Sequence, residues 1–467
     1  MSELGDGYEV TDDFFGAPFV DLDEEREDPR PHRYVHGGFE GTGTRFALYF
    51  PPPERYRDHF VHCIGGGRGG SEQSGMSPVG RFGGGFDIAF DNQAYLVDSN
   101  QGHIGADELC PKGGDDSSIY GYRASAETAR FARHVARRIY GAPPDHGYLF
   151  GGSGGANRAV ACLEQVEGLW DGVVVNSGFG NLRRGFRNSS AVNGAVRALG
   201  EKLRDVVDAM DVGGSGRPYD GLTTEQRERL ADVYRLGCPR GGESALGGAF
   251  GIATWTLLAE DLMRREPEYF RAYWSEPGYR GHDELGTEAF EKTTTVTGVH
   301  TAAELTERVG GAPPMAITWR SPEAVVGISV ADELPADTVA LTVTVLGGEA
   351  SGRMVQSGGV IGDALLAAPW QSGDGQRLMF GGVAPGDEVK IENRPLLAFC
   401  DWYRHHVLDG PGFDFLRMDG APLYPQHPHV DDPAPQFGEV EVTGRFAGKM
   451  IMLNPLHTSP ADRILYQ

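Results

Sequence analysis

The sequence predicts an α/β protein with a mostly parallel central sheet, helices on both faces and a large insertion. Short apolar runs at residues 60–64, 94–98, 147–150 and 170–176 alternate with helical patterns, as strands joined by helices do. The last of these runs is continuously apolar, which is typical of parallel strands buried on both faces. The next core strand is expected only at residues 448–454, so a large segment is inserted into the predicted fold.

Composition and charge limit what the chain can bind. Its 467 residues are 40% hydrophobic and carry a formal net charge of -24, which fits one large domain with an insertion, or two domains. We expect no nucleic-acid and no membrane partner, because no Lys/Arg cluster supplies a positive face and no segment reaches the ~18 apolar residues of a membrane span. The N-terminus lacks the basic and apolar regions of a signal peptide, so a cytoplasmic location is expected.

The cysteines show neither a disulfide nor a metal-binding pattern. They are odd in number and scattered without CxxC spacing, so we expect small buried hydrophobic side chains. No metal and no cofactor are expected. The five residues are Cys63, Cys110, Cys162, Cys238 and Cys400.

The first elements of the chain lead into the core. Residues 1–30 are acidic and end in prolines, so a poorly ordered or surface-hugging arm is expected. The first part of the core is expected at residues 31–181, beginning with an alternating, aromatic strand at 44–50. A helix is expected from Ser125, because apolar residues recur at every fourth position before two prolines end the pattern.

Residues 182–395 are expected to form a lid inserted into the core. The pattern is mostly helical to about residue 330 and becomes β-like at 338–393, with glycine-rich turns between short strands. Aromatic residues at 269–279 are interpreted as part of the lid's own core, with an acyl or aryl pocket as the alternative. The chain is then expected to return to the core at 396–467, with a helix at 396–407.

A serine at the centre of a glycine-rich turn is the strongest chemical signal. An apolar strand ends in Gly-Gly, Ser153 and Gly-Gly, and small aliphatic residues with helical spacing follow. Such a turn, the nucleophile elbow of α/β-hydrolases, presents the serine hydroxyl above the sheet, and its glycines let strand and helix approach closely. Glycine is common here, with 69 of 467 residues, so the strand, turn and helix context carries the prediction of an α/β-hydrolase fold. An ordinary glycine-rich connection is the alternative.

A second glycine cluster, at residues 65–70, follows the strand at 60–64. In α/β-hydrolases the N–H groups that bind the oxyanion come from such a loop and from the residue after the nucleophile. We therefore expect Gly66 or Gly67, together with Gly154, to form an oxyanion hole. A plain flexible loop is the alternative, whereas a phosphate-binding loop is disfavoured because no Lys-Ser/Thr pair follows.

Asp98 and His103 lie near the end of the predicted strand at 94–98. Sites in open α/β sheets are built at the carboxyl ends of strands, so these residues are candidates for such a site. A hydrogen-bonded turn is the other interpretation.

An activated serine needs a histidine base and an acid, which follow it in chain order in this fold. The interpretation we favour takes Asp462 as the acid and places the histidine beyond residue 467, so that the chain is truncated. The second takes His457 as the base, oriented by Asp401, Asp431 or Asp432, and the third has no working triad. Four other histidines are expected in surface or connector positions: His405, His406, His427 and His429.

These stretches, taken in order, resemble the tannase and feruloyl-esterase-like family of α/β-hydrolases, and the resemblance covers most of the chain. It implies that Ser153 is the nucleophile and that the substrate is an ester of an aromatic or other bulky acid. The carrying stretches are residues 32–42, 65–70, 96–103, 150–158, 269–279 and 448–467.

The sequence departs from that family in two places. Tannase-type members have a cysteine directly before the nucleophile, joined by a disulfide to one beside the catalytic histidine. Here position 152 is glycine, and Cys162 lies too far along the helix to substitute. The family also has an acid shortly after the last strand and a histidine well beyond it, whereas residues 456–462 place no Asp immediately after the strand.

We therefore expect a serine-dependent carboxylic-ester hydrolase that acts through an acyl-enzyme on a small-molecule ester. One alternative is a non-catalytic or impaired small-molecule binder on the same fold. Another is a hydrolase of lactones or thioesters. A nucleotide-binding protein is disfavoured, because the chain has neither a phosphate-loop lysine nor the acidic residue of a dinucleotide-binding unit.

Overall fold

The computed structural model divides into two compact units, which are described separately. Unit 1 comprises Met1–Leu182 and Ala434–Leu456, and unit 2 comprises Arg183–Pro433 and His457–Gln467. The structure describes residues 3–76, 84–104, 114, 116–176, 182–247, 249–309, 311–318, 320–407, 412–428, 438, 440 and 442–453.

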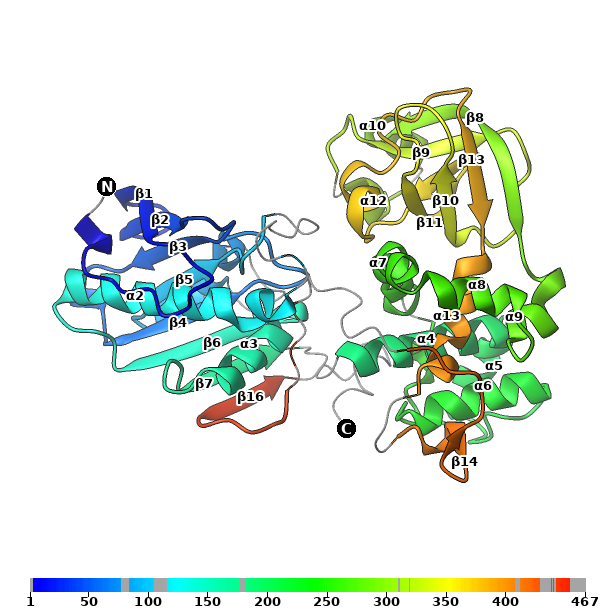
Figure 1. Ribbon diagram of the computed structural model, residues 1–467, viewed down its shortest axis with the longest axis horizontal. Helices are drawn as coiled ribbons and strands as arrows, with labels where there is room; N and C mark the ends of the chain where they lie inside the picture. Colours follow the sequence, from blue (N-terminus) through cyan, green and yellow to red (C-terminus); the bar gives the residue numbers. More distant parts are fainter. Residues whose placement is uncertain are drawn as a thin grey trace. The chain divides into compact units, whose positions relative to one another are not determined.

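Unit 1 is built on an eight-stranded sheet with the order β1-β2-β3-β5-β4-β6-β7-β16 (Figure 1). The pairs from β5 to β16 are parallel, and the pairs from β1 to β5 are antiparallel. The mostly parallel sheet expected from the sequence is thus present. Its strands are β1 (Pro18–Arg26), β2 (His32–Phe39), β3 (Arg45–Phe50), β4 (His59–Ile64), β5 (Tyr95–Ser99), β6 (His146–Gly152), β7 (Gly172–Asn176) and β16 (Lys449–Leu453).

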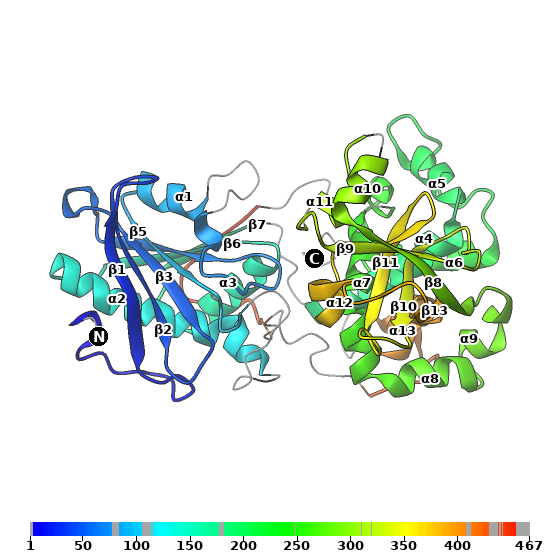
Figure 2. The same cartoon turned by 90° about the horizontal axis from the view of Figure 1, so that it is seen from above.

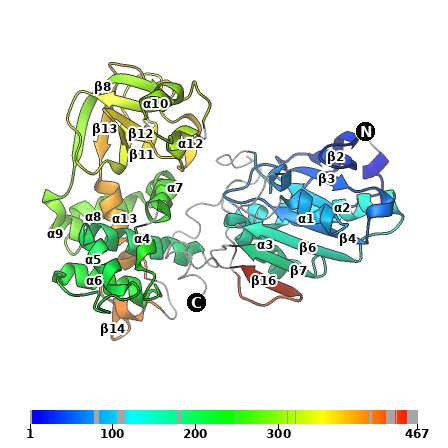
Figure 3. The same ribbon diagram turned by 180° about the vertical axis from the view of Figure 1, so that it is seen from behind.

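Helices cover both faces of this sheet, as Figures 2 and 3 show. Helices α2 (Ala124–Tyr140) and α3 (Gly154–Gln165) pack on one face, and α1 (Gly85–Asp91) packs on the other. The alternation of β4 explains the two cores, because Phe60 and Ile64 join the first and Val61 and Cys63 join the second. Shorter helical turns are Glu3–Gly5, Pro53–Arg55, Ser74–Met76 and Ile119–Arg123.

The N-terminal segment differs from the arm that we expected. Residues 18–26 form β1, which pairs with β2 at the edge of the sheet, and Arg33 donates two hydrogen bonds of 2.8 Å to Asp23. The acidic side chains of β1 point mostly to solvent. Charged residues on an edge strand commonly prevent edge-to-edge pairing. Here the acidic residues replace the alternation of apolar and polar residues by which a strand is recognised in a sequence.

Unit 2 combines a helical part with a closed barrel of six strands in the order β10-β11-β12-β9-β8-β13. The barrel encloses its own apolar core. A second core is shared by the helices α4 (Leu182–Leu199), α5 (Lys202–Met210), α6 (Thr224–Arg235) and α13 (Arg394–His405). The strands are β8 (Glu291–Thr301), β9 (Val325–Val330), β10 (Val339–Val345), β11 (Met354–Ile361), β12 (Ala364–Ala367) and β13 (Glu388–Glu392), with the hairpin β14 (Arg417–Met418) and β15 (Ala421–Pro422) outside the barrel.

Two of the described helices of unit 2 begin at side-chain caps. Thr223 and Thr301 form capping boxes with Gln226 and Glu304 at the starts of α6 and α10. The helices are α4 (Leu182–Leu199), α5 (Lys202–Met210), α6 (Thr224–Arg235), α7 (Ala249–Arg265), α8 (Pro267–Ser275), α9 (Arg280–Asp283), α10 (Ala302–Arg308), α11 (Met315–Thr318), α12 (Gly373–Leu378) and α13 (Arg394–His405), with short turns at Glu243–Ala245, Leu285–Thr287 and Asp414–Leu416.

Two of the expected boundaries differ from the structure. We expected helix α13 in the second part of the core, but it belongs to unit 2. There the ring centroids of Phe399 and Trp255 lie 5.0 Å apart, and the Tyr403 hydroxyl donates to the Asp232 carboxylate. The β-rich region also begins earlier than residue 338, because β8 and β9 are barrel strands. The expected burial of Cys63, Cys162, Cys238 and Cys400 is confirmed, and Cys110 lies outside the described residues.

Candidate active site

Ser153 lies at the junction between β6 and α3. Its backbone has φ 55° and ψ -125°, a conformation that costs a residue with a side chain about 1–3 kcal/mol. Its N–H donates to the carbonyl oxygen of Asn176, at the end of β7, at 2.9 Å. The serine is exposed. The predicted strand, sharp turn and helix are thus present.

The glycines around Ser153 permit a close backbone approach. A Cβ atom on Gly154 would lie 2.1 Å from the carbonyl oxygen of Gly67, and one on Gly155 would lie 2.2 Å from that of Ile64. Both distances are far below van der Waals contact, so side chains are excluded at both positions. The start of α3 therefore packs directly on the end of β4 and on the loop at 65–70.

Ser153 opens onto a cavity of about 250 Å³. Of the three glycines expected to hold an oxyanion, Gly66 is among the lining residues, whereas Gly154 is the buried first residue of α3. The N–H groups of a first helical turn have no partner within the helix. The cavity is lined by Cys63, Ile64, Gly65, Gly66, Ser74, Phe150, Gly152, Ser153 and Asn176.

The glycine loop is held by side chains from two elements. Arg158, on α3, donates from Nη2 to the carbonyl oxygens of Gly65 at 2.7 Å and Gly67 at 3.0 Å. From the turn after β5, Gln101 donates to the Gly65 carbonyl at 3.4 Å, and the Asn100 carbonyl accepts from the Gly70 N–H at 3.1 Å. A loop with these contacts has a defined shape, which disfavours the plain flexible loop.

Asp98, in β5, and His103, in the turn after it, hydrogen-bond to different segments. Asp98 accepts hydrogen bonds from the N–H groups of Gly75 and Ser99, and its burial raises its pKa well above the ordinary value. The Nε2 of His103 donates to the carbonyl oxygen of Arg68 at 2.7 Å. Neither side chain lines the cavity of Ser153, and the contacts of Asp98 with Gly75 and of His103 with Arg68 join distant segments of unit 1.

The residues expected as base and acid are not placed by the structure. His457 and Asp462, together with the alternatives Asp431 and Asp432, lie outside the described residues, as does His429. Asp401 lies inside unit 2 and contacts Arg229 at 2.7 Å.

The histidines at the end of α13 are buried, so surface or connector positions for His405 and His406 were wrong. His406 Nε2 lies 2.9 Å from Glu266 Oε2, and burial lowers the pKa of His405 to about 4. His427 is partly buried, with its Nε2 2.6 Å from the Tyr279 hydroxyl. Tyr269 and Tyr273 are buried in unit 2 beside these rings, which supports the interpretation that they fill that unit's own core.

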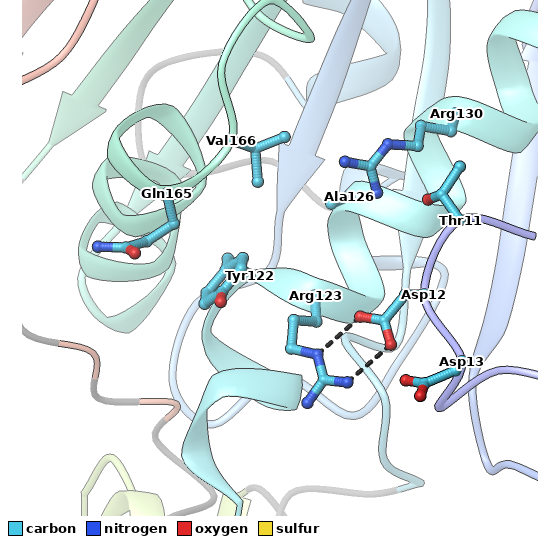
Figure 4. A pocket seen from close by; sticks show the side chains of 9 residues that line it. All are labelled: Thr11, Asp12, Asp13, Tyr122, Arg123, Ala126, Arg130, Gln165 and Val166. Atoms are coloured by element: carbon cyan, nitrogen blue, oxygen red, sulfur yellow. Dashed lines mark hydrogen bonds and ion pairs between the residues drawn. The ribbon is translucent and has the colours of Figure 1, made fainter.

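A second cavity of unit 1, of about 380 Å³, lies between the N-terminal segment and the helices α2 and α3 (Figure 4). Arg123 points at Asp12 and donates two hydrogen bonds of 2.7 Å to its carboxylate. The hydrogen bonds from Arg123 lower the pKa of Asp12, and the Asp12 carboxylate neutralises the charge of the guanidinium. The arrangement anchors the N-terminal segment.

Sequence reasoning missed two residues of the candidate site, Arg158 and Asn176. Arg158 left a weak signal, a charged residue among the small aliphatic residues of the helix after Ser153. Asn176 ends a strand next to the serine strand, a position whose meaning depends on the strand order.

Two other features are absent from the part of the chain that the structure describes. No group of three or more His, Cys, Asp or Glu side chains in the described part of the chain could hold a metal ion. Among the same residues, no helix is long and apolar enough to cross a membrane.

Comparison with known proteins gives distant structural similarity and no family. No family model and no curated protein matches the chain. Among solved structures, the chain is similar to the tannin acyl hydrolase from Aspergillus niger, at 14% identity and a TM-score of 0.32, over 42% of this chain and 39% of that one. Feruloyl esterase B from Aspergillus oryzae gives 13% identity and a TM-score of 0.35, over 53% and 62%.

An esterase from Aspergillus oryzae gives 12% identity and a TM-score of 0.36, over 52% of this chain and 62% of that one. The chain thus spans less than two thirds of each of these three proteins. Similarity at this level establishes neither a family nor an activity for this chain.

Proposed function

We propose that unit 1 is the core of an α/β-hydrolase and that the chain is a serine-dependent carboxylic-ester hydrolase. The observation that carries the proposal is the conformation of Ser153, an exposed serine at positive φ between a strand and a helix, beside a cavity that it shares with Gly66. Backbone strain of this kind persists only where the surroundings fix it, and it concentrates at functional sites. The geometry supports a nucleophile elbow.

In the proposed reaction, Ser153 Oγ attacks the ester carbonyl carbon and the carbonyl oxygen becomes an oxyanion. The N–H groups of Gly154 and Gly66 bind that oxyanion, and each such donor contributes about 3–4 kcal/mol to lowering the barrier. The general base takes the proton from Ser153 Oγ and gives it to the leaving oxygen, so an alcohol leaves as the carbon–oxygen ester bond breaks and the acyl group stays on Ser153. Water then attacks the acyl-enzyme and releases the acid.

The proposed base lies outside the described residues. Among those residues, no histidine lines the cavity that holds Ser153. Two alternatives stay proposals: Asp462 is the acid for another base, or His457 is the base and Asp401, Asp431 or Asp432 orients it. The second candidate function is a small-molecule binder that keeps the turn without a working triad.

The substrate class and the role of unit 2 are also proposals. The sequence resemblance favours an ester of an aromatic or other bulky acid over a lactone or thioester, and a panel of leaving groups distinguishes them. The chain enters unit 2 after β7 and leaves it before β16. An insertion at this point of the chain supports the role of a lid.

The first prediction concerns Ser153. A fluorophosphonate should label the wild-type protein at Ser153, and p-nitrophenyl esters should be hydrolysed. The substitution Ser153→Ala should abolish labelling and lower kcat by about 10⁴-fold or more, because the nucleophile is gone. Labelling is followed by mass spectrometry of the peptide that contains residue 153.

The matched control is Ser74→Ala, which removes another serine hydroxyl from the lining of the same cavity. Its hydroxyl donates to the Ser71 carbonyl at 3.0 Å, so the variant should keep both labelling and turnover. A folded wild-type protein that neither labels nor turns over would contradict the esterase proposal and favour the binder.

A further inference from the structure

Arg158 is a buried charge beside the candidate site. It lies on α3, and 1% of its surface is exposed. Burying a charged group is costly unless hydrogen bonds replace those it made with water. Arg158 donates such hydrogen bonds to the carbonyl oxygens of Gly65 and Gly67. Burial lowers the pKa of this guanidinium to about 10, so it stays protonated at neutral pH.

These two contacts fix the orientation of peptide groups in the glycine loop. In a trans peptide the C=O and the following N–H point in opposite directions. The Gly65 carbonyl points to Arg158, so the Gly66 N–H points away from it, and Gly66 lines the cavity of Ser153. In the same way, the Gly67 carbonyl points to Arg158, so the Arg68 N–H of that peptide points away from the guanidinium. Arg68, however, does not line the Ser153 cavity.

The Gly67 N–H is oriented by a different contact. It belongs to the peptide whose carbonyl is that of Gly66, and this carbonyl accepts from the Gly69 N–H at 3.1 Å within the loop. Gly67 is therefore set by the turn of the loop itself, and its own carbonyl faces Arg158 and the backbone of Gly154.

We propose that Arg158 is a positioning residue that holds the peptide between Gly65 and Gly66 with its N–H directed at the Ser153 cavity, so that Gly66 is the loop's oxyanion donor. This inference rests on the proposed function. Neither Gly65 nor Gly66 has a Cβ atom, so this peptide can rotate at little steric cost once its carbonyl is released. The guanidinium removes that freedom before substrate arrives.

The rest of the loop does not depend on Arg158. Gly70 stays bonded to Asn100, and the Arg68 carbonyl stays bonded to His103. Substitution of Arg158 should therefore release two carbonyl groups without detaching the loop: that of Gly67, and that of Gly65, which keeps only the 3.4 Å contact from Gln101. The effect expected is on transition-state stabilisation and not on substrate binding.

The test uses Arg158→Met and Arg158→Lys in the full chain. We expect Arg158→Met to lower kcat for p-nitrophenyl esters by about 10²–10³-fold, the effect of losing one oxyanion donor, with KM changed less than about 3-fold. Arg158→Lys should recover part of kcat, because an ammonium can donate to the same carbonyl oxygens. A boronic acid, which mimics the tetrahedral intermediate, should lose affinity in parallel with kcat.

The control is Arg187→Met, which removes another fully buried arginine bonded to a backbone carbonyl, that of His406 in unit 2. It should lower stability without this loss of kcat, measured at equal folded fraction. A kcat within about 3-fold of wild type in Arg158→Met, or an equal loss in Arg187→Met, would overturn the positioning role.

A structural measurement separates this inference from the proposed function. A crystal structure of Arg158→Met should show the Gly65 carbonyl rotated away from residue 158, or amide exchange at Gly66 should become faster. If the wild type has no Ser153-dependent turnover, the esterase proposal fails. An unchanged Gly65–Gly66 peptide in the variant would then refute the positioning role by itself.

Discussion

His62 is a buried histidine on β4 that makes the stability of unit 1 depend on pH. Its ring is fully buried, neither nitrogen has a hydrogen-bond partner among the described residues, and burial lowers its pKa to about 3 from the ordinary 6.5. Between these values the unfolded chain binds a proton that the folded chain does not. The free energy of unfolding is therefore not reduced by His62 above pH 6.5, and it decreases as the pH falls from 6.5 towards 3, because protonation then favours the unfolded chain.

We predict that the free energy of unfolding of the wild type falls by about 2 kcal/mol more than that of His62→Leu between pH 7 and pH 5, since a tenfold change in proton affinity corresponds to about 1.4 kcal/mol. Urea unfolding followed by fluorescence at the two pH values measures this difference. His146→Leu, in an exposed histidine of β6, is the matched control. A parallel loss in wild type and His62→Leu would show that His62 is not the group responsible.

Sequence reasoning at the residue scale succeeded where the signal is local. The turn at Ser153 could be predicted from the glycines on both sides of one serine. Glycine has no Cβ atom, so its identity alone indicates that a sharp turn and a close backbone approach are possible. The proposed choice of Gly66 over Gly67 could not be made from the sequence, because it rests on carbonyl oxygens that accept from Arg158, about 90 positions away. Every residue has a backbone carbonyl group, so the residue types in a sequence do not indicate which carbonyl oxygen accepts a given hydrogen bond.

At the scale of elements, helix α2 holds the N-terminal segment through one buried carboxylate. Glu127 accepts hydrogen bonds from the Tyr8 hydroxyl and the Thr11 hydroxyl at 2.6 Å each, and from the Thr11 N–H at 3.0 Å. Its side chain has 0% exposure. The segment before β1 is thus fastened to the face of the sheet that α2 covers.

We predict that Glu127→Ala lowers the free energy of unfolding by about 2–4 kcal/mol, because three donors lose a charged acceptor. Urea unfolding measures the loss, and hydrogen exchange should rise in the peptides before residue 18. Arg130→Ala removes only an ion pair at 3.5 Å to the same carboxylate and should cost less than about 1 kcal/mol. Equal losses in the two variants would mean that the ion pair, and not the tether, stabilises the segment.

The last strand shows what an apolar pattern leaves open. The sequence predicted a strand at 448–454, and β16 is present and parallel to β7. It is less buried than the expected core strand, since Ile451, Met452 and Leu453 are 59%, 43% and 37% exposed. Apolar residues show that a strand suits a sheet, whereas burial also needs neighbours. Among the described residues, β7 is its one partner strand, so β16 stands at the edge of the sheet.

At the scale of the whole chain, the division into two units was predicted better than its boundaries. The long stretch between β7 and the last strand indicated an insertion, and most of unit 2 lies there. Helix α13 was assigned to the wrong unit, because an amphipathic pattern reveals that a helix has an apolar face but not which core that face meets. The barrel was not predicted for a similar reason: closing it pairs β8 with β13, about 90 residues further along.

The two units have separate buried cores, so damage to one core should be measurable in that unit first. In unit 2, Arg229 contacts Asp401 at 2.7 Å, both side chains are at most 2% exposed, and Tyr273 donates to the same carboxylate. Burial raises the pKa of Asp401, but Arg229 and Arg404 outweigh it and bring the pKa to about 2. This group therefore stabilises the fold above pH 3.8, and its contribution is lost as the pH falls through 2.

We predict that Asp401→Asn lowers the stability of unit 2 by about 3–5 kcal/mol at neutral pH, because it leaves a buried arginine without its counter-charge. Hydrogen exchange followed by mass spectrometry should become faster in peptides from α6, α8 and α13, and stay unchanged in β4, β6 and α3. Asp337→Asn, which removes an exposed partner of Arg197, should change exchange little. Faster exchange throughout both units in Asp401→Asn would mean that the units open together, because local loss of one ion pair would then have lowered the stability of a single cooperative structure.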